Sequence, residues 1–194
     1  MSETSSKSPN FGPSIEPQQT SSLGRELAVW GRDAAIAVGL AVIIIVFLYQ
    51  PVQVEGTSMA PLLSDQERIF INKFVYRFEP IHRGDVVTFW YPLDTSQSFI
   101  KRVIGLPGDT IEIKAGDLYV NGKHVAEPYV PARYFDDSSY GPITIPDDEY
   151  FVMGDHRDSS NDSRIFGPVA RKYIYGKAVF AYWPFKEFGE ITAP

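Results

Sequence analysis

The hydrophobic pattern of the chain has one dominant feature near its N-terminus. Residues 34–48 are apolar and uncharged, and as a helix they would span about 22 Å of a hydrocarbon core of about 30 Å. Extending the segment back to Val29 and Trp30 completes the required length, and Trp30 and Tyr49 suit the two interfacial layers of a bilayer. We therefore predict an uncleaved transmembrane anchor over residues 29–50.

Two other interpretations of this segment fit the residues less well. A buried core helix would show a polar stripe, and a cleaved signal peptide would have small residues where Leu48-Tyr-Gln-Pro-Val-Gln53 is bulky. Arg25 and Arg32 precede the apolar run, whereas the first basic residue after it is Arg68. Because positive charge favours the cytoplasmic side, the polar residues 1–28 are predicted to be a disordered cytoplasmic tail, and the chain after the anchor is predicted to be extracytoplasmic.

Beyond the anchor, the pattern changes to short runs of β-branched and aromatic residues separated by turn residues. The predicted strands are Val52–Val54, Arg68–Val75, Asp85–Tyr91, Phe99–Ile104, Thr110–Ile113, Leu118–Val120, Tyr150–Met153 and Lys177–Trp183. Asn121-Gly122 is typical of a type I′ hairpin turn. We predict a mainly β protein, with an antiparallel β-sheet domain over residues 51–194. A loop-rich insertion is expected at about 105–148, with Pro- and Gly-rich loops between 127 and 148.

Composition excludes several classes of function. The net charge is −6 and no element concentrates Lys and Arg, so a nucleic-acid partner is not expected. The chain contains no cysteine, which excludes thiol catalysis, disulfides and cysteine-ligated metals. Its three histidines, His82, His124 and His156, follow no metal-ligand spacing. We expect neither a metal nor a cofactor.

The first candidate for chemistry is a serine in Gly56-Thr-Ser-Met-Ala-Pro61, directly after the first predicted strand. Gly56 and Pro61 can hold Ser58 on a turn, with its hydroxyl exposed and a backbone N–H placed to stabilise an oxyanion. An ordinary serine in a turn would show the same pattern, because a nucleophilic serine also needs a base. None of the histidines lies in a recognisable triad motif.

A candidate base lies in Phe99-Ile-Lys-Arg-Val-Ile-Gly-Leu-Pro-Gly-Asp109. On a strand, Phe99, Lys101 and Val103 share one face, so Lys101 stands between two apolar neighbours. Burial disfavours the ammonium and lowers the pKa of the amine, which could then take the proton of Ser58 and later deliver it to the leaving amine. The alternative is a strand lysine whose amine reaches water. Arg102, on the opposite face, is expected to be structural.

The third segment, Gly154-Asp-His-Arg-Asp-Ser-Ser-Asn-Asp-Ser-Arg164, gathers charges and hydroxyls in one loop. Its spacing does not fit a calcium-binding EF-hand. An Asp162–Arg164 pair could brace a site, and a serine hydroxyl could orient the lysine amine. A solvated polar turn is the alternative.

Taken together, the segments resemble the bacterial type I signal peptidases, a family of Ser/Lys serine proteases. The resemblance covers the anchor and nearly all of residues 50–184, in the family's order. Four boxes carry it: Gly56-Thr-Ser-Met-Ala-Pro-Leu-Leu63 at the nucleophile, Arg83-Gly-Asp-Val-Val-Thr-Phe89 in a structural strand, Lys101-Arg-Val-Ile-Gly-Leu-Pro-Gly-Asp109 at the lysine, and Gly154-Asp155 through Arg164.

The resemblance implies a signal-peptidase-type antiparallel β-sheet catalytic domain and a role for each matching residue. Ser58 would be the nucleophile and Lys101 the general base. Ser160 would hydrogen-bond the lysine amine, Asp162 and Arg164 would form a supporting ion pair, and Asp155 matches a further supporting position. Shallow pockets for small substrate side chains would be lined by Val52, Val54, Met59, Leu63 and Ile100.

Three positions depart from the family pattern. Leu62 stands where a threonine is usual, and His156 stands where an asparagine is usual. Some members carry an oxyanion-hole serine two residues before the nucleophile. This chain has Gly56 at that position, as other branches of the family do. The second oxyanion donor is therefore open, with Thr57 or a water as candidates.

The implied function is removal of signal peptides from exported preproteins after an Ala-x-Ala-like site, at the outer face of the cell membrane or of an internal energy-transducing membrane. The expected partners are signal peptides and membrane lipid. Self-cleaving Ser/Lys repressor proteases are one alternative, but residues 1–50 show no helix-turn-helix pattern. A catalytically silent anchored module that binds exported chains is another, and the presence of both Ser58 and Lys101 argues against it.

Overall fold

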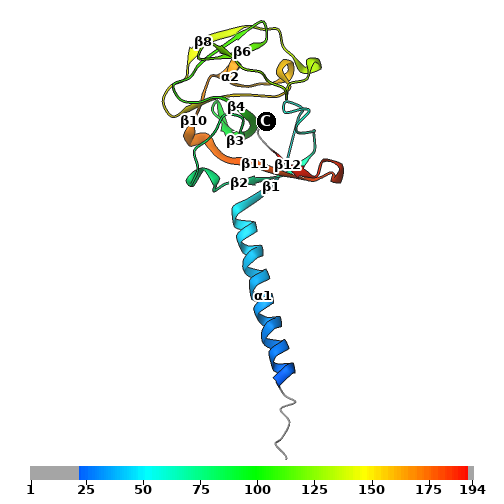
Figure 1. The fold of residues 1–194 in the computed structure, drawn as a ribbon. Helices are drawn as coiled ribbons and strands as arrows, with labels where there is room; N and C mark the ends of the chain where they lie inside the picture. Colours follow the sequence, from blue (N-terminus) through cyan, green and yellow to red (C-terminus); the bar gives the residue numbers. More distant parts are fainter. Residues whose placement is uncertain (1–21, 192–194) are drawn as a thin grey trace, which may run out of the picture. The chain divides into compact units, whose positions relative to one another are not determined.

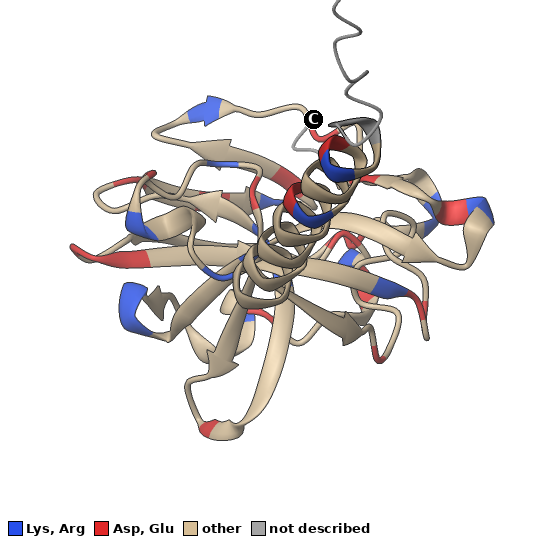
Figure 2. Cartoon of the chain, turned by 90° about the horizontal axis from the view of Figure 1, so that it is seen from below, with Lys and Arg blue, Asp and Glu red and all other residues tan. Residues whose placement is uncertain are grey.

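The computed structural model describes residues 22–191, in which one long helix is followed by a β-rich domain (Figure 1). Helix α1 runs from Ser22 to Leu48, and its segment Gly24–Leu48 is long and apolar enough to cross a membrane, judged by length and composition. Its charged residues gather toward its N-terminal end (Figure 2). The remaining turns expose only uncharged side chains, as a lipid-facing helix requires.

The boundaries of this helix differ from the predicted anchor of residues 29–50. The helix ends at Leu48, and the next two residues already belong to the first strand. The helix also includes residues 22–28, which were predicted to be part of a disordered tail. These residues include Leu, Arg, Glu and Ala, which favour helix, and no proline. The rest of the predicted tail, residues 1–21, and residues 192–194 lie outside the described part of the chain.

The larger sheet has eight strands, and every pairing in it is antiparallel. Its order is β1-β2-β11-β3-β4-β9-β10, and β12 pairs with β11. The strands are β1 (Tyr49–Gln53), β2 (Arg68–Asn72), β3 (Val86–Tyr91), β4 (Asp94–Gly105), β9 (Glu149–Met153), β10 (Val169–Ala170), β11 (Ile174–Trp183) and β12 (Gly189–Glu190). The order brings β4 to the middle of the sheet, between β3 and β9.

A second antiparallel sheet of four strands follows the order β7-β6-β5-β8. It consists of β5 (Thr110–Lys114), β6 (Asp117–Val120), β7 (Lys123–His124) and β8 (Tyr140–Thr144). In Figure 1 it lies at the end of the domain opposite β1 and β2. The helical turns are η1 (Val75–Arg77), η2 (Ala132–Tyr134), η3 (Arg157–Ser159), α2 (Ser163–Phe166), η4 (Arg171–Tyr173) and η5 (Phe185–Glu187).

The second sheet adds a strand to residues 127–148, where Pro- and Gly-rich loops were predicted. This strand, β8, includes Gly141-Pro142. Proline is tolerated there because β8 is an edge strand. Ile143 pairs with Ile111 of β5 and packs against the apolar cluster under this sheet. The predicted type I′ turn is present, since Asn121 and Gly122 both have positive φ, 52° and 75°.

The core of the larger sheet is buried on both faces. Successive residues of β3 belong to different apolar clusters: Val86 packs with Ile69 and Ile71 of β2, whereas Val87 and Phe89 pack on the other side. A strand buried on both faces has no solvent side for polar residues. The neighbouring strand β4 therefore holds the polar residues of its C-terminal half, Lys101 and Arg102 among them, inside the protein.

Candidate active site

Ser58 lies in the turn that follows β1, and its neighbours hold that turn in place. Gly56 has a φ of 90°, a conformation that favours glycine, and its N–H donates to Asp65 Oδ1 at 2.7 Å. Met59 is buried beside Ser58, and its carbonyl accepts a hydrogen bond from the N–H of Leu63 at 2.9 Å. Ser58 itself is half-buried. Its neighbours thus fix the backbone of the turn that carries the hydroxyl.

Lys101 points at this serine from the middle of the sheet. It pairs with Val87 of β3, its exposed fraction is only 4%, and its Nζ lies 2.6 Å from Ser58 Oγ in a hydrogen bond. The two residues are 43 positions apart in the sequence. The structure therefore brings together the two residues predicted to form the dyad.

The electrostatic surroundings of Lys101 favour the neutral amine. Burial lowers its pKa from 10.5 to about 8, and the charges of Asp162 and Asp155 only partly oppose this shift. Within residues 22–191 no carboxylate forms an ion pair with Lys101. The centre of the Phe99 ring lies 5.3 Å from Nζ. The amine can therefore act as a base near neutral pH.

A groove of about 430 Å³ opens beside the serine and the lysine. Among the predicted pocket residues, Val54, Met59 and Ile100 line it. Leu63 is fully buried in the same apolar cluster, and Val52 packs against that cluster, but neither of these two lines the groove. Ser159 and Asn161 also line the groove and were not predicted to do so, because only folding brings their loop to it.

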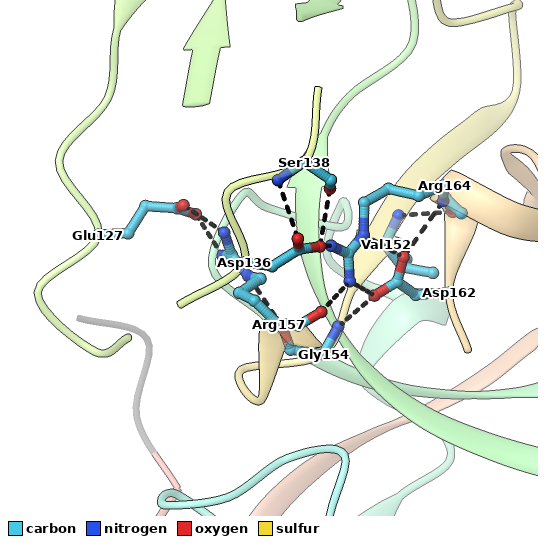
Figure 3. Close-up of polar contacts among 9 residues, drawn as sticks. Glu127, Asp136, Ser138, Val152, Gly154, Arg157, Asp162 and Arg164 are labelled. Atoms are coloured by element: carbon cyan, nitrogen blue, oxygen red, sulfur yellow. Dashed lines mark hydrogen bonds and ion pairs between the residues drawn. The ribbon is translucent and has the colours of Figure 1, made fainter. Parts of the chain in front are cut away.

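The loop after β9 carries the predicted supporting pair. Arg164 binds Asp162 through two bonds of 2.9 Å, from Nε to Oδ1 and from Nη2 to Oδ2 (Figure 3). Asp162 also accepts a hydrogen bond from the N–H of Gly154 at 3.1 Å. A further bond of 3.2 Å from the N–H of Arg164 makes Asp162 the N-cap of α2. Asp162 is fully buried, so this pair fixes the loop rather than contacting the groove.

Asp155 forms its ion pair with Arg102 rather than with the lysine amine. Arg102 Nε and Nη2 donate to the two carboxylate oxygens at 2.8 and 2.7 Å. Arg102 also donates to the carbonyl of Gly84 at 3.0 Å, and its guanidinium lies 4.2 Å from the ring centre of Tyr129. Arg102 thus has the structural role that was expected, with Asp155 as its partner. The sequence did not indicate this pairing, because the two residues are 53 positions apart.

Two more ion pairs join this loop to the segment between β7 and β8. Arg157 binds Glu127, and Arg164 Nη1 binds Asp136 Oδ2 at 2.6 Å (Figure 3). Ser138 in turn donates twice to Asp136, from its N–H and from its hydroxyl. The predicted loop-rich insertion therefore braces the site, a role that its residue pattern did not indicate.

Ser160 does not make the hydrogen bond that the resemblance implied. Its Oγ is buried and has no hydrogen-bond partner among residues 22–191. The expected hydrogen bond to the lysine amine is absent, and the amine is hydrogen-bonded to Ser58 Oγ. Ser160 packs beside Gly154, where any Cβ would collide with Ser160 Oγ and with the carbonyl oxygen of Ser58. This close approach requires glycine and joins the loop to the nucleophile turn.

Comparison with known proteins identifies the family. A family model described as "Signal peptidase, peptidase S26" matches residues 27–183. The chain is 43% identical over 167 residues to a signal peptidase I of Bacillus amyloliquefaciens, covering 81% of this chain and 89% of that protein. It is 40% identical over 173 residues to signal peptidase I S of Bacillus subtilis (strain 168), covering 84% and 92%.

A solved structure of a signal peptidase I from Enterococcus faecalis V583 aligns with 33% sequence identity and a TM-score of 0.46, over 51% of this chain and 97% of that chain. The extent of the family-model match and the identity to the two Bacillus proteins are sufficient to assign the family. On these grounds the chain belongs to the signal peptidase family, peptidase S26.

Proposed function

We propose that this protein is a membrane-anchored serine endopeptidase that removes signal peptides from exported preproteins, with Ser58 as nucleophile and Lys101 as general base. One observation carries the catalytic assignment: a lysine amine in a residue only 4% exposed lies 2.6 Å from a serine hydroxyl beside a groove. The substrate follows from family membership and from relatives named signal peptidase I.

The chemistry begins with proton transfer inside the dyad. Neutral Lys101 accepts the proton of Ser58 as Oγ attacks the carbonyl carbon of the scissile peptide bond. The resulting tetrahedral oxyanion is stabilised by the backbone N–H of Ser58. The Lys101 ammonium then gives its proton to the leaving amine, and an acyl-enzyme remains on Ser58. Lys101, neutral again, accepts a proton from the water that attacks the ester, and returns it to Ser58 Oγ as the C–O bond to Ser58 breaks and the carboxylic acid product leaves.

The groove is suited to an extended peptide with small side chains next to the scissile bond. Its apolar wall is made by Val54, Met59 and Ile100, and two of these are almost fully buried behind it. A wall that is packed from behind cannot move to admit a bulky side chain without loss of packing. We therefore infer a preference for alanine at the two positions of an Ala-x-Ala site.

The anchor places the enzyme in the same membrane as its substrates. Arg25 and Arg32 near the start of α1, and the apolar segment that follows, support an N-terminus in the cytoplasm and a catalytic domain outside it. A preprotein held in the bilayer by its own apolar segment is then confined to two dimensions with the enzyme, which raises their effective concentration.

The test uses the full chain in detergent with a peptide that contains an Ala-x-Ala site, and mass spectrometry of the products. We expect cleavage after the second alanine, and loss of cleavage in Ser58→Ala and in Lys101→Met. Ser96→Ala and Lys114→Met are matched controls at exposed positions away from the groove, and both should retain activity. Cleavage that survives in Ser58→Ala would refute the assignment of the nucleophile.

Topology has a separate test, because the chain contains no cysteine. Single cysteines introduced by Ser5→Cys in the N-terminal tail and by Lys123→Cys in the exposed β7 can be treated in intact cells with a membrane-impermeant maleimide. We expect labelling at position 123 alone. Labelling at position 5 alone would reverse the proposed orientation.

A further inference from the structure

His156 holds the nucleophile turn at two consecutive carbonyl groups. Its backbone N–H donates to the carbonyl oxygen of Ser58 at 3.1 Å. Its ring nitrogen Nδ1 lies 3.1 Å from the carbonyl oxygen of Thr57, 99 positions away in the sequence. One residue of the loop after β9 therefore contacts the peptide units on both sides of the Ser58 Cα.

The contact with Thr57 has a consequence for the adjacent N–H. The carbonyl of Thr57 and the N–H of Ser58 belong to the same planar peptide unit, which is not among the cis bonds of the described chain. In a trans peptide these two groups point in opposite directions, so whatever fixes the C=O also fixes the N–H. The Thr57 carbonyl also accepts the N–H of Ala60 at 2.9 Å within the turn, so His156 is its second partner. A hydrogen bond at the carbonyl also polarises the unit and strengthens its N–H as a donor.

The N–H of Ser58 is the amide whose orientation is fixed in this way. Within the part of the chain that the structure describes, it donates to no protein acceptor, whereas the N–H of Gly56 is already used by Asp65. A free amide beside a serine nucleophile is the donor that the oxyanion of an acyl-transfer reaction needs. Gly56 contributes no side-chain hydroxyl, so the orientation of this one N–H carries more of the stabilisation.

The imidazole of His156 is itself held in place. Its Nε2 lies 3.0 Å from Asp158 Oδ1, and its ring centre lies 4.0 Å from that of Tyr134 in η2. The side chain is 18% exposed. Nδ1 faces a carbonyl oxygen and Nε2 a carboxylate oxygen, and the ring donates to Thr57 in the form that carries a proton on Nδ1. The ring is therefore held with Nδ1 at the Thr57 carbonyl.

We propose that His156 is a positioning residue: its Nδ1–H donates to the Thr57 carbonyl and so holds the Ser58 N–H toward the developing oxyanion. This inference rests on the proposed function, since it assigns a role within the same reaction. His156 does not touch the reacting atoms. It acts through the Thr57–Ser58 peptide unit, and its effect belongs to the transition state rather than to substrate binding.

Two substitutions separate the two ring contacts. Asn carries its amide nitrogen where Nδ1 lies, so His156→Asn keeps a donor for the Thr57 carbonyl and loses the contact with Asp158. Gln carries its amide nitrogen one bond farther out, near the position of Nε2, so His156→Gln keeps a partner for Asp158 and loses the donor to Thr57. Both variants retain the backbone N–H that binds the Ser58 carbonyl.

The experiment measures kcat and KM of the full chain in detergent for an Ala-x-Ala peptide, together with the affinity for a peptide boronic acid that forms a tetrahedral adduct on Ser58. We expect His156→Gln to lower kcat about 10- to 100-fold, with KM changed less than about twofold. The boronic acid should bind more weakly by a similar factor. His156→Asn should stay within about threefold of the unsubstituted protein in all three quantities.

Several results would overturn the proposal. His156→Gln with an unchanged kcat, a loss confined to KM, or equal losses in both variants accompanied by a lower melting temperature would each make His156 a simple brace. An unsubstituted protein that cleaves no faster than Ser58→Ala would refute the proposed function itself and this inference with it. If the unsubstituted protein cleaves and only the His156 comparison fails, the proposed function stands.

Discussion

Lys101 and Arg102 are neighbours on β4, both almost fully buried at 4% and 1% exposure, and yet their surroundings differ in kind. Because successive residues of a strand point to opposite faces, each meets a different part of the domain. Lys101 meets a serine hydroxyl and forms no ion pair among the described residues. Arg102 meets both oxygens of Asp155, the carbonyl of Gly84 and the ring of Tyr129.

The difference shows that burial alone does not decide what a basic side chain does. A buried cation with a bidentate carboxylate keeps its charge and fixes two segments of the chain to each other. A buried amine without such a partner loses affinity for its proton, and becomes a base within reach of the nearest hydroxyl. The dyad face of β4 is therefore reactive and the ion-pair face is structural.

The strongest way to break the comparison is to remove the amine. Lys101→Met keeps the length and the apolar stem of the side chain and eliminates the base. We expect kcat for an Ala-x-Ala peptide to fall by about 10⁴-fold or more, as in other serine proteases that lose a member of the catalytic group. The protein should stay folded, with a melting temperature at least equal to that of the unsubstituted chain. A residual rate within tenfold of the original would contradict the dyad.

The second test removes the partner from Arg102. Asp155→Asn leaves a buried guanidinium without its carboxylate, and we expect the free energy of unfolding to fall by about 3–5 kcal/mol, measured by urea denaturation of the full chain in detergent. The matched control, Arg102→Met combined with Asp155→Leu, removes both charges and should recover most of the loss. If Asp155→Asn lowered kcat without lowering stability, Asp155 would belong to the dyad face instead.

The third test uses pH to read the state of Lys101. Its pKa is about 8 in the folded protein, lowered by burial from 10.5. Below pH 8 the amine is protonated in both the folded and the unfolded state. Between pH 8 and 10.5 the unfolded chain binds a proton that the folded chain lacks, so folding becomes more favourable as pH rises. Relative to Lys101→Met, the unsubstituted protein should gain about 3 kcal/mol over this window.

The same ionisation should control activity. The acidic limb of kcat/KM should have its midpoint near pH 8, because only the neutral amine accepts the proton of Ser58. Phe99→Ala would admit water near Nζ and raise the pKa of Lys101, which moves the limb to higher pH. A limb that stays fixed in Phe99→Ala would count against the account based on burial.

The sequence predicted one face of β4 well and the other poorly, for a physical reason. Ser58 and Lys101 lie in short motifs whose residue types indicate a nucleophile and a base. The strands around them can be predicted from the local pattern of apolar and polar residues. The structural role of Arg102, in contrast, depends on the carboxylate of Asp155 in the loop after β9. Which of the many carboxylates pairs with which arginine depends on the topology of two sheets, and no local pattern encodes it.

The second sheet and the role of His156 illustrate the same limit. β8 contains Gly141-Pro142, which local rules assign to a turn, and only its place at a sheet edge allows a strand. His156 was recognised as a departure from the family pattern, but its contact with the Thr57 carbonyl spans 99 positions. Interactions of this range are set by packing, which a single sequence does not display.

The smallest expected effect concerns Ser160, which lies at the junction of the two regions. Its Oγ is buried without a partner among residues 22–191, so the hydroxyl contributes no hydrogen bond to stability as it stands. If it turns toward the Lys101 amine once Ser58 has given up its proton, Ser160→Ala should lower kcat about three- to tenfold. The free energy of unfolding should stay the same or rise slightly. The exposed Ser139→Ala is the control for kcat and should leave it unchanged. A marked loss of stability in Ser160→Ala would instead place this hydroxyl with the ion-pair face of the site.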